Sequence, residues 1–182
     1  MLFEPKTVLL KDGRTAVLRP PAREDGGPML DVMRRISGET PFILRNPEEW
    51  DDVTVEWEES FLDGRREDPS MCFIVAEVDG KIAGNCCVAI HLREKVRHRA
   101  SVAISLLRDY WNLGLGTALF ERMIETAKGW GCTQLELEFV EGNTRARALY
   151  EKMGFAIVGV KPDAIRLKDG TLLREYSMIR KL

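Results

Sequence analysis

The sequence predicts an α/β fold with a mixed central sheet, built as one domain over residues 1–182. Strand-like segments meet at two-residue turns such as Asp12-Gly13 and Asp79-Gly80, which reverse the chain and make the joined strands antiparallel. One strand ends near Leu107, a helical segment follows, and another strand lies around Leu135. A crossover of this kind makes those two strands parallel, so the sheet must be mixed.

The other elements follow in chain order from the spacing of apolar residues and from turn residues. We expect a hairpin within residues 6–20, helices over 23–36 and from 47 to about 62, strands within 70–92 and 98–107, a helix over 116–129, a strand over 133–139, a helix over 143–153, and two strands within 155–179. A chain of 182 residues is long enough to fill one core and short for two.

Composition excludes several classes of function. Hydrophobic residues make up 45% and charged residues 31%, as in an ordinary globular protein, and the net charge of -2 gives no general attraction to nucleic acid or anionic membranes. No stretch approaches the ~18 apolar residues that a membrane span needs, so we expect a cytoplasmic protein. The cysteines are spaced neither as zinc ligands nor as a disulfide framework, and we expect buried thiols and no metal: Cys72, Cys86, Cys87 and Cys132.

The stretch "LRDYWNLGLGTALFERM", residues 107–123, places a glycine turn directly before a helical pattern. Gly114 and Gly116 permit positive φ angles, and the start of a helix offers about four unpaired N–H groups to an anion such as a phosphate. No lysine follows Gly116, which excludes a P-loop, and Leu119 stands where a dinucleotide fingerprint needs its third small residue. A tight turn without any ligand explains this segment equally well when it is taken alone.

Two motifs together resemble the signatures of the Gcn5-related N-acetyltransferases (GNAT). "WNLGLG", from Trp111 to Gly116, resembles the pattern Gln/Arg-x-x-Gly-x-Gly/Ala, with tryptophan where the family often has glutamine or arginine. "NTRARALYEKMGF", residues 143–155, matches the second signature at Asn143, Ala146, Leu149, Tyr150, Gly154 and Phe155. The resemblance implies the family's fold, in which a parallel pair of strands splays apart between flanking helices, and it implies acetyl-CoA as cosubstrate.

The resemblance also implies roles for particular residues. The pyrophosphate of acetyl-CoA would lie on backbone N–H groups of the glycine turn, and its pantetheine would pair with the strand end at 105–107. A backbone N–H at that strand end, from Leu106 or Leu107, would polarise the acetyl carbonyl. Tyr150, whose phenol has a reference pKa near 10, would protonate the departing thiolate. The residues expected to bind the cosubstrate are Leu106, Leu107, Asn112, Leu113, Gly114, Leu115, Gly116, Thr117, Asn143, Arg147 and Tyr150.

Several of these residues also have purely structural explanations. Asn143 is well suited to cap a helix, and the resemblance adds a contact with the pantetheine or its neighbouring peptide, so that Asn143 is counted with Tyr150 and Glu39 among the expected catalytic residues. Arg147 and Lys152 project from the same helix and could meet the phosphates, although solvated surface charge explains either one singly.

The general base and the acceptor are less well defined by the sequence. Glu39, His98, Glu136 and Glu138 are candidate bases, and a chain of waters is an alternative. We expect the acceptor to contact the loop "SGETPFILRNPEEW", residues 37–50, where Glu39 suits an ammonium group, Phe42 and Trp50 an apolar group, and Arg45 a carboxylate. This mixture fits a primary amine of a small molecule or of a peptide N-terminus.

Two other functions stay open from the sequence. The chain could transfer a different acyl group, such as succinyl, or it could be a non-catalytic domain that binds and senses acyl-CoA. The family resemblance also implies that a homodimer could form through the C-terminal strands.

Overall fold

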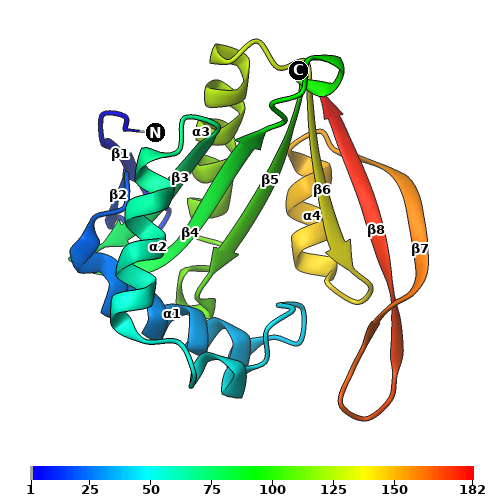
Figure 1. Ribbon diagram of the computed structural model, residues 1–182, viewed down its shortest axis with the longest axis horizontal. Coiled ribbons are helices and arrows are strands. Elements are labelled where there is room, and N and C mark those ends of the chain that lie inside the picture. The colour runs from blue at the N-terminus through cyan, green and yellow to red at the C-terminus, as the bar shows by residue number, and fades with distance from the viewer. Residues whose placement is uncertain (1) are drawn as a thin grey trace.

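The computed structural model describes residues 2–182 and is built around an eight-stranded sheet in the order β1-β2-β3-β4-β5-β6-β8-β7 (Figure 1). The strands are β1 (Lys6–Leu9), β2 (Thr15–Arg19), β3 (Met71–Val78), β4 (Lys81–Ile90), β5 (Arg99–Leu106), β6 (Gln134–Val140), β7 (Ala156–Arg166) and β8 (Leu172–Lys181). The α-helices are α1 (Gly26–Glu39), α2 (Val55–Glu67), α3 (Leu115–Gly129) and α4 (Thr144–Lys152).

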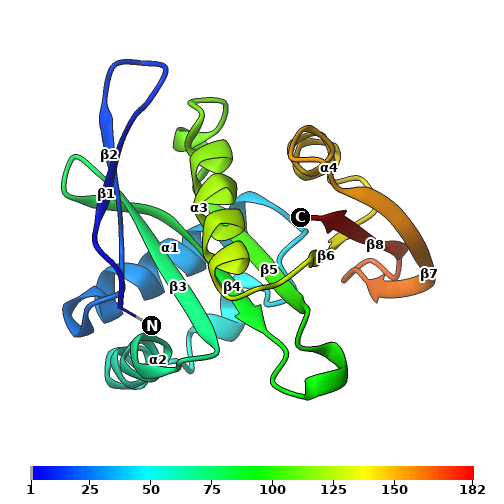
Figure 2. The ribbon, with the colours of Figure 1, turned by 90° about the horizontal axis from the view of Figure 1, so that it is seen from above.

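The helices cover the two faces of the sheet in pairs. Helices α1 and α2 lie on one face, and α3 and α4 lie on the other (Figure 2). The larger core is on the α3–α4 face, where α3 buries Leu119, Phe120 and Met123 against the sheet. A smaller core under α1 and α2 includes Met29 and Leu62. Helices α1 and α3 therefore bury apolar residues that recur at helical spacing in the sequence.

The two parallel strands separate soon after they begin. Strands β5 and β6 pair only from Arg99–Ser101 to Gln134–Glu136, and every other strand pair in the sheet is antiparallel. Beyond these three pairs the strands diverge (Figure 1). The predicted mixed sheet with a splayed parallel pair is confirmed.

The backbone at the end of β5 alternates between its two neighbours. The N–H of Leu107 donates to the carbonyl of Ala83 on β4. Because successive residues of a strand turn their N–H and C=O groups to opposite sides, those of Leu106 point away from β4 and into the space where β6 has diverged. An extended ligand could pair with this unpaired strand edge.

Two helix starts differ from the sequence prediction. Residues Pro47–Trp50 form a separate 3₁₀ turn, and α2 begins only at Val55. Thr54 caps α2, because its hydroxyl accepts a hydrogen bond from the N–H of Trp57 at 3.2 Å. Another 3₁₀ turn, Arg23–Asp25, precedes α1. Within residues 2–182, no helix combines the length and the apolar character required to cross a membrane.

Candidate active site

The glycine turn forms a cradle of unpaired backbone amides, which we define as residues 112–117. Asn112 and Gly114 have φ angles of 62° and 90°, and such positive values favour glycine and are tolerated by asparagine. The first intrahelical bond of α3 runs from the N–H of Ala118 to the carbonyl of Gly114 at 3.1 Å. The N–H groups of Leu115–Thr117 accordingly have no acceptor among the described residues, and they lie at the positive end of a helix. This arrangement suits a phosphate group.

The second glycine of the cradle serves the packing of α3 against α4. A Cβ atom at Gly116 would lie 3.0 Å from Cδ2 of Leu149, which belongs to α4. The missing side chain lets the two helices approach closely, so α4 lies beside the cradle. The carbonyl of Leu113 is occupied, since it accepts the N–H of Lys11 at 3.0 Å.

Trp111 joins the cradle to the end of β5. Its indole N–H donates to the carbonyl of Leu106 at 2.9 Å. This bond takes part of the hydrogen-bonding capacity of the strand edge on which the pantetheine was expected to lie. Of the two residues predicted to polarise an acetyl carbonyl, Leu107 has its N–H bonded to β4, and Leu106 turns its N–H toward the diverging strands.

Tyr150 lies on the inner side of α4 in an aromatic environment. Its ring is 5.5 Å from that of Phe120 and 6.2 Å from that of Phe139, and the residue is only 8% exposed. Burial raises the pKa of Tyr150 to about 12, so the phenol keeps its proton throughout the neutral range. Asn143 holds the start of α4, because its side-chain oxygen accepts the N–H of Ala146 at 3.2 Å.

Basic side chains of α4 lie on different sides of the helix. Arg147 pairs with Glu151 on the exposed surface at 2.8 Å, and its contact with a cosubstrate stays a prediction. Arg145, which the sequence analysis did not single out, donates to the side chain of Asn112 at 3.2 Å. Two residues along a helix turn by roughly 200°, which separates these arginines. Only the tertiary structure shows that Arg145 lies over the cradle.

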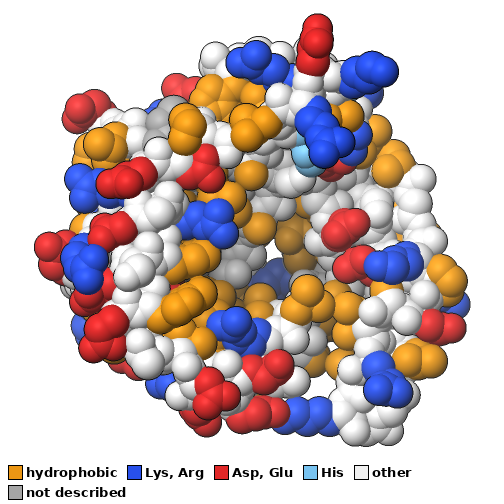
Figure 3. Space-filling view, in the orientation of Figure 1, with side chains coloured by type: hydrophobic (Ala, Val, Ile, Leu, Met, Phe, Trp, Pro, Cys, Tyr) orange, Lys and Arg blue, Asp and Glu red, His pale blue; other side chains and the backbone are white. Residues whose placement is uncertain are grey.

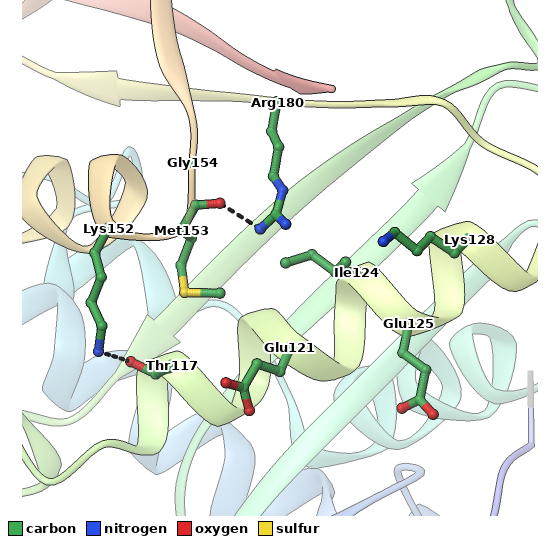
Figure 4. Close-up of a pocket in the computed structure, with 9 residues that line it drawn as sticks. All are labelled: Thr117, Glu121, Ile124, Glu125, Lys128, Lys152, Met153, Gly154 and Arg180. Carbon is green, nitrogen blue, oxygen red and sulfur yellow. Dashed lines mark hydrogen bonds between the residues drawn. The ribbon is translucent and has the colours of Figure 1, made fainter. Parts of the chain in front are cut away.

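A second contact between α4 and the cradle borders an open pocket of about 660 Å³ (Figure 4). The Nζ of Lys152 donates to the hydroxyl of Thr117 at 3.0 Å. Ile124 and Met153 give the pocket apolar surface, and Arg180 reaches it from β8, where its guanidinium donates to the carbonyl of Met153. The pocket thus continues from the cradle along α3.

Glu39 anchors the loop between α1 and α2 to the end of β5. One carboxylate oxygen accepts the backbone N–H of Arg108 at 2.7 Å, and the other accepts the guanidinium of Arg35 at 2.9 Å. On the opposite side, the ring of Phe42 lies 3.5 Å from the position that a Cβ of Gly142 would take, directly after β6. Residues 40–46, which we call the strap, therefore connect the ends of the two diverging strands.

The other predicted acceptor contacts in this loop are turned inward. Trp50 is 8% exposed, and its indole N–H donates to the hydroxyl of Ser37 at 2.8 Å. The guanidinium of Arg45 lies over the Trp50 ring, 4.4 Å from its centre. Trp50 is thus part of the support of the strap, and Phe42 remains half-buried beside the divergent strands.

The candidate bases occupy very different environments. Glu136 holds Arg99 through two hydrogen bonds of 2.6 Å, and this guanidinium keeps the pKa of the carboxyl below its usual range. His98 precedes β5, at the end of the strand away from the divergence. Glu138 faces the same side as Glu136, is exposed, and has no bonded partner among residues 2–182. It is the first residue of that face of β6 beyond the last β5–β6 pair.

The α1–α2 face of the molecule is hollowed where β5 and β6 diverge (Figure 3). Acidic side chains lie beside this hollow over β6 and β8. Among these strands, Glu138 and Glu175 stand on one face, since the register pairs Glu138 with Ser177 and Val140 with Glu175. In the part of the chain that the structure describes, no cluster of His, Cys, Asp or Glu could hold a metal ion.

Comparisons with known proteins agree with this geometry. Residues 31–155 match the sequence profile of the family described as "Acetyltransferase (GNAT) family". An L-amino acid N-acetyltransferase of Escherichia coli is 29% identical over 125 residues, which cover 68% of this chain and 74% of that protein. A GNAT-family acetyltransferase from Streptococcus pneumoniae superposes with a TM-score of 0.83 at 29% identity, covering 92% of this chain and 99% of the other.

A Salmonella typhimurium structure that contains its cofactor acetyl-CoA has the same fold. It superposes with a TM-score of 0.77 over 92% of this chain and 94% of its own, at 18% identity.

Proposed function

The chain belongs to the acetyltransferase (GNAT) family and is an N-acetyltransferase, and from this premise we propose that it transfers an acetyl group from acetyl-CoA to a primary amine of a small molecule or a peptide N-terminus. The observation that carries the proposal is the row of unpaired amides at Leu115–Thr117, beside a helix that holds Tyr150. The family uses acetyl-CoA as cosubstrate, and the similar protein of Escherichia coli acts on L-amino acids.

The residues present fit acetyl-CoA as a ligand. The cradle offers N–H groups without acceptors to the diphosphate, and Lys152 lies close enough to reach the same anion. The N–H of Leu106 faces the space between the diverging strands, where it can donate to a carbonyl of the ligand. Acetyl-CoA supplies an acetyl group that is activated as a thioester. That a Salmonella structure of this fold holds acetyl-CoA supports the same use of the site.

We assign the proton transfers to two side chains on opposite faces of the sheet. An amine acceptor arrives as an ammonium ion, and Glu138 takes one of its protons and passes it to solvent. The nitrogen lone pair then forms the C–N bond as the C–S bond breaks. Tyr150 gives its phenolic proton to the departing sulfur and regains one from solvent. The second proton leaving the nitrogen enters solvent, so one proton is released per turnover.

The acceptor would approach from the α1–α2 face. The cradle and α4 occupy the other face (Figure 2), and the hollow between β5 and β6 opens on the α1–α2 face (Figure 3). Glu138 gives the β6–β8 side of the hollow a negative charge that attracts an ammonium group, whereas Glu175 on the same face is paired with Lys161 at 3.7 Å. The strap borders this hollow, since it is held at the end of β5 by Glu39 and at the end of β6 by Phe42.

A panel of amines tests the proposal. Release of CoA thiol would be followed with acetyl-CoA and L-amino acids, short peptides and simple alkylamines, with succinyl-CoA as the rival donor. Acetyl-CoA at ~100 times its dissociation constant should also stabilise the fold by about 2.7 kcal/mol. Stabilisation without turnover on any amine would favour an acyl-CoA sensor, and turnover only with succinyl-CoA would favour the other acyl transfer.

Pairing of two copies through the C-terminal strands is part of the same proposal. Strand β7 is an edge of the sheet, and Val158 and Val160 on it are 56% and 52% exposed. An exposed edge strand with apolar side chains can pair with another chain. Sedimentation of the parent and of Val158→Lys would test this, and a parent that sediments as a monomer would contradict it.

A further inference from the structure

Helix α4 places an arginine with no acidic partner against the phosphate cradle. Arg145 donates one hydrogen bond to Asn112, and its guanidinium lies over the ring of Trp111, 4.0 Å from the ring centre. Arg145 is exposed and makes no ion pair with any described residue. A guanidinium carries several N–H donors in one plane, so most of those of Arg145 remain free for an anion.

Trp111 of the cradle motif supports the side chain of Arg145. The pattern of the family often has glutamine or arginine at position 111, and this chain has Trp111 instead. The indole contacts three groups: its N–H bonds the carbonyl of Leu106, and the guanidinium groups of Arg145 and Arg108 lie 4.0 Å and 5.5 Å from its ring centre. A cation from α4 thereby lies against the cradle, beside Trp111 and Asn112.

We infer that Arg145 binds the diphosphate of acetyl-CoA at the cradle. The inference rests on the proposed use of acetyl-CoA by this site. An arginine is suited to this role because it can give two parallel N–H bonds to phosphate oxygens. Asn112 and Trp111 already hold the guanidinium in place, so little side-chain freedom is lost when the anion binds.

Calorimetric binding to ligands with and without phosphates tests the inference. We expect Arg145→Gln to weaken the binding of acetyl-CoA by about tenfold or more, because a charge-assisted hydrogen bond is lost. The 3′-dephospho form of acetyl-CoA keeps the diphosphate, so the substitution should weaken its binding by the same factor. S-acetyl-pantetheine has no diphosphate and should bind the parent and the variant equally. Added salt should reduce the difference between parent and variant. Arg145→Lys should keep part of the affinity.

Controls separate this role from a structural one. Arg93→Gln removes the same charge from an exposed loop between β4 and β5 and should bind acetyl-CoA like the parent. Equal losses for S-acetyl-pantetheine and acetyl-CoA would show that Arg145 only holds the cradle in shape, and would overturn the inference. So would a loss for acetyl-CoA that is absent with the dephospho form, because Arg145 would then bind the 3′-phosphate. A parent that binds none of these ligands would refute the proposed function, and the inference with it.

Discussion

The carboxylate of Glu39 accepts the backbone N–H of Arg108 at 2.7 Å and so joins the end of α1 to the end of β5. Its other oxygen is bonded to Arg35, so both oxygens already have donors. Both carboxylate oxygens are therefore engaged in holding the strap to its neighbours. Glu39 is therefore placed to anchor the strap. Its bond to Arg108 lies two residues after Leu106, whose N–H faces the diverging strands.

Glu39→Ala should therefore affect acceptor binding more than proton transfer. We expect a KM for the amine several-fold higher, because the strap loses its attachment to β5, and an unchanged shape of the pH profile of kcat. Steady-state kinetics between pH 6 and 9 would measure both. Loss of the acidic limb of that profile in the variant would instead identify Glu39 as the base.

Tyr150→Phe should lower kcat by about a hundredfold, the usual size of a lost general acid, and leave acetyl-CoA affinity nearly unchanged. The two side chains have almost the same shape, and the surrounding rings of Phe120 and Phe139 would pack against either one. Kinetics would be combined with a direct binding measurement. A variant with full kcat would remove Tyr150 from the reaction.

The same tyrosine predicts how activity depends on alkaline pH. Because burial raises the pKa of Tyr150 to about 12, the phenol stays protonated and can donate at all pH values below that. Between pH 8 and about 10, ionisation of this phenol should not lower the kcat of the parent. The kcat of the parent and of Tyr150→Phe should therefore have the same pH dependence in this range. A fall in kcat, if observed in the parent alone, would mean that the phenol ionises much earlier than its environment implies.

The sequence predicted those features that depend on neighbours along the chain. Two-residue turns, alternating strands and the strand-helix-strand crossover led to the mixed sheet, and two local motifs led to the cradle and to the helix of Tyr150. The start of α2 was wrong because Pro47 begins a helical turn that does not continue, and Thr54 supplies the cap that does. A proline at the first helical turn and a capping threonine are both typical of helix starts, and they occur here within eight residues. Packing determines which of them begins the long helix.

The parts of the site that the sequence missed are contacts between distant segments. Arg145 and Arg147 look alike in "NTRARAL", and only the rotation of α4 against the cradle distinguishes them. The sequence around Glu39 does not indicate Arg108 as its partner, and only the fold places the backbone N–H of Arg108 beside its carboxylate. Glu136 and Glu138 share a face of one strand, and the partner Arg99 on β5 decides which of them is free. Each of these contacts joins segments that are far apart in the sequence, so the periodic pattern of residues does not predict it.

Glu58 predicts a change of stability with pH. This residue of α2 is 3% exposed, and burial raises the pKa of its carboxyl, with Arg45 acting weakly in the opposite direction. A carboxyl with a raised folded-state pKa lowers stability as pH rises through and above its unfolded pKa. Glu58→Gln should therefore raise Tm at pH 7, and the difference should vanish as pH falls below about 4.3, where both states are protonated.

Thermal unfolding of parent and variant across pH 4 to 8 would measure this effect. For a chain of this size, 1 kcal/mol corresponds to roughly 2–4 °C in Tm. Glu67→Gln, at the exposed end of the same helix, is the matched control and should shift stability by less than about 0.5 kcal/mol. A Tm difference for Glu58→Gln that is the same at every pH would contradict burial of the charge as its cause.

Glu138→Gln tests the proposed base. At neutral pH we expect kcat/KM for the amine to fall by about a hundredfold, because the ammonium loses the group that takes its proton. Raising the pH should recover most of that loss, since more of the amine is then neutral in solution and needs no base. Glu94→Gln, an exposed glutamate between β4 and β5, should behave like the parent at each pH. A uniform loss that higher pH does not recover would assign Glu138 to acceptor binding alone, and the proton would then have to leave through water.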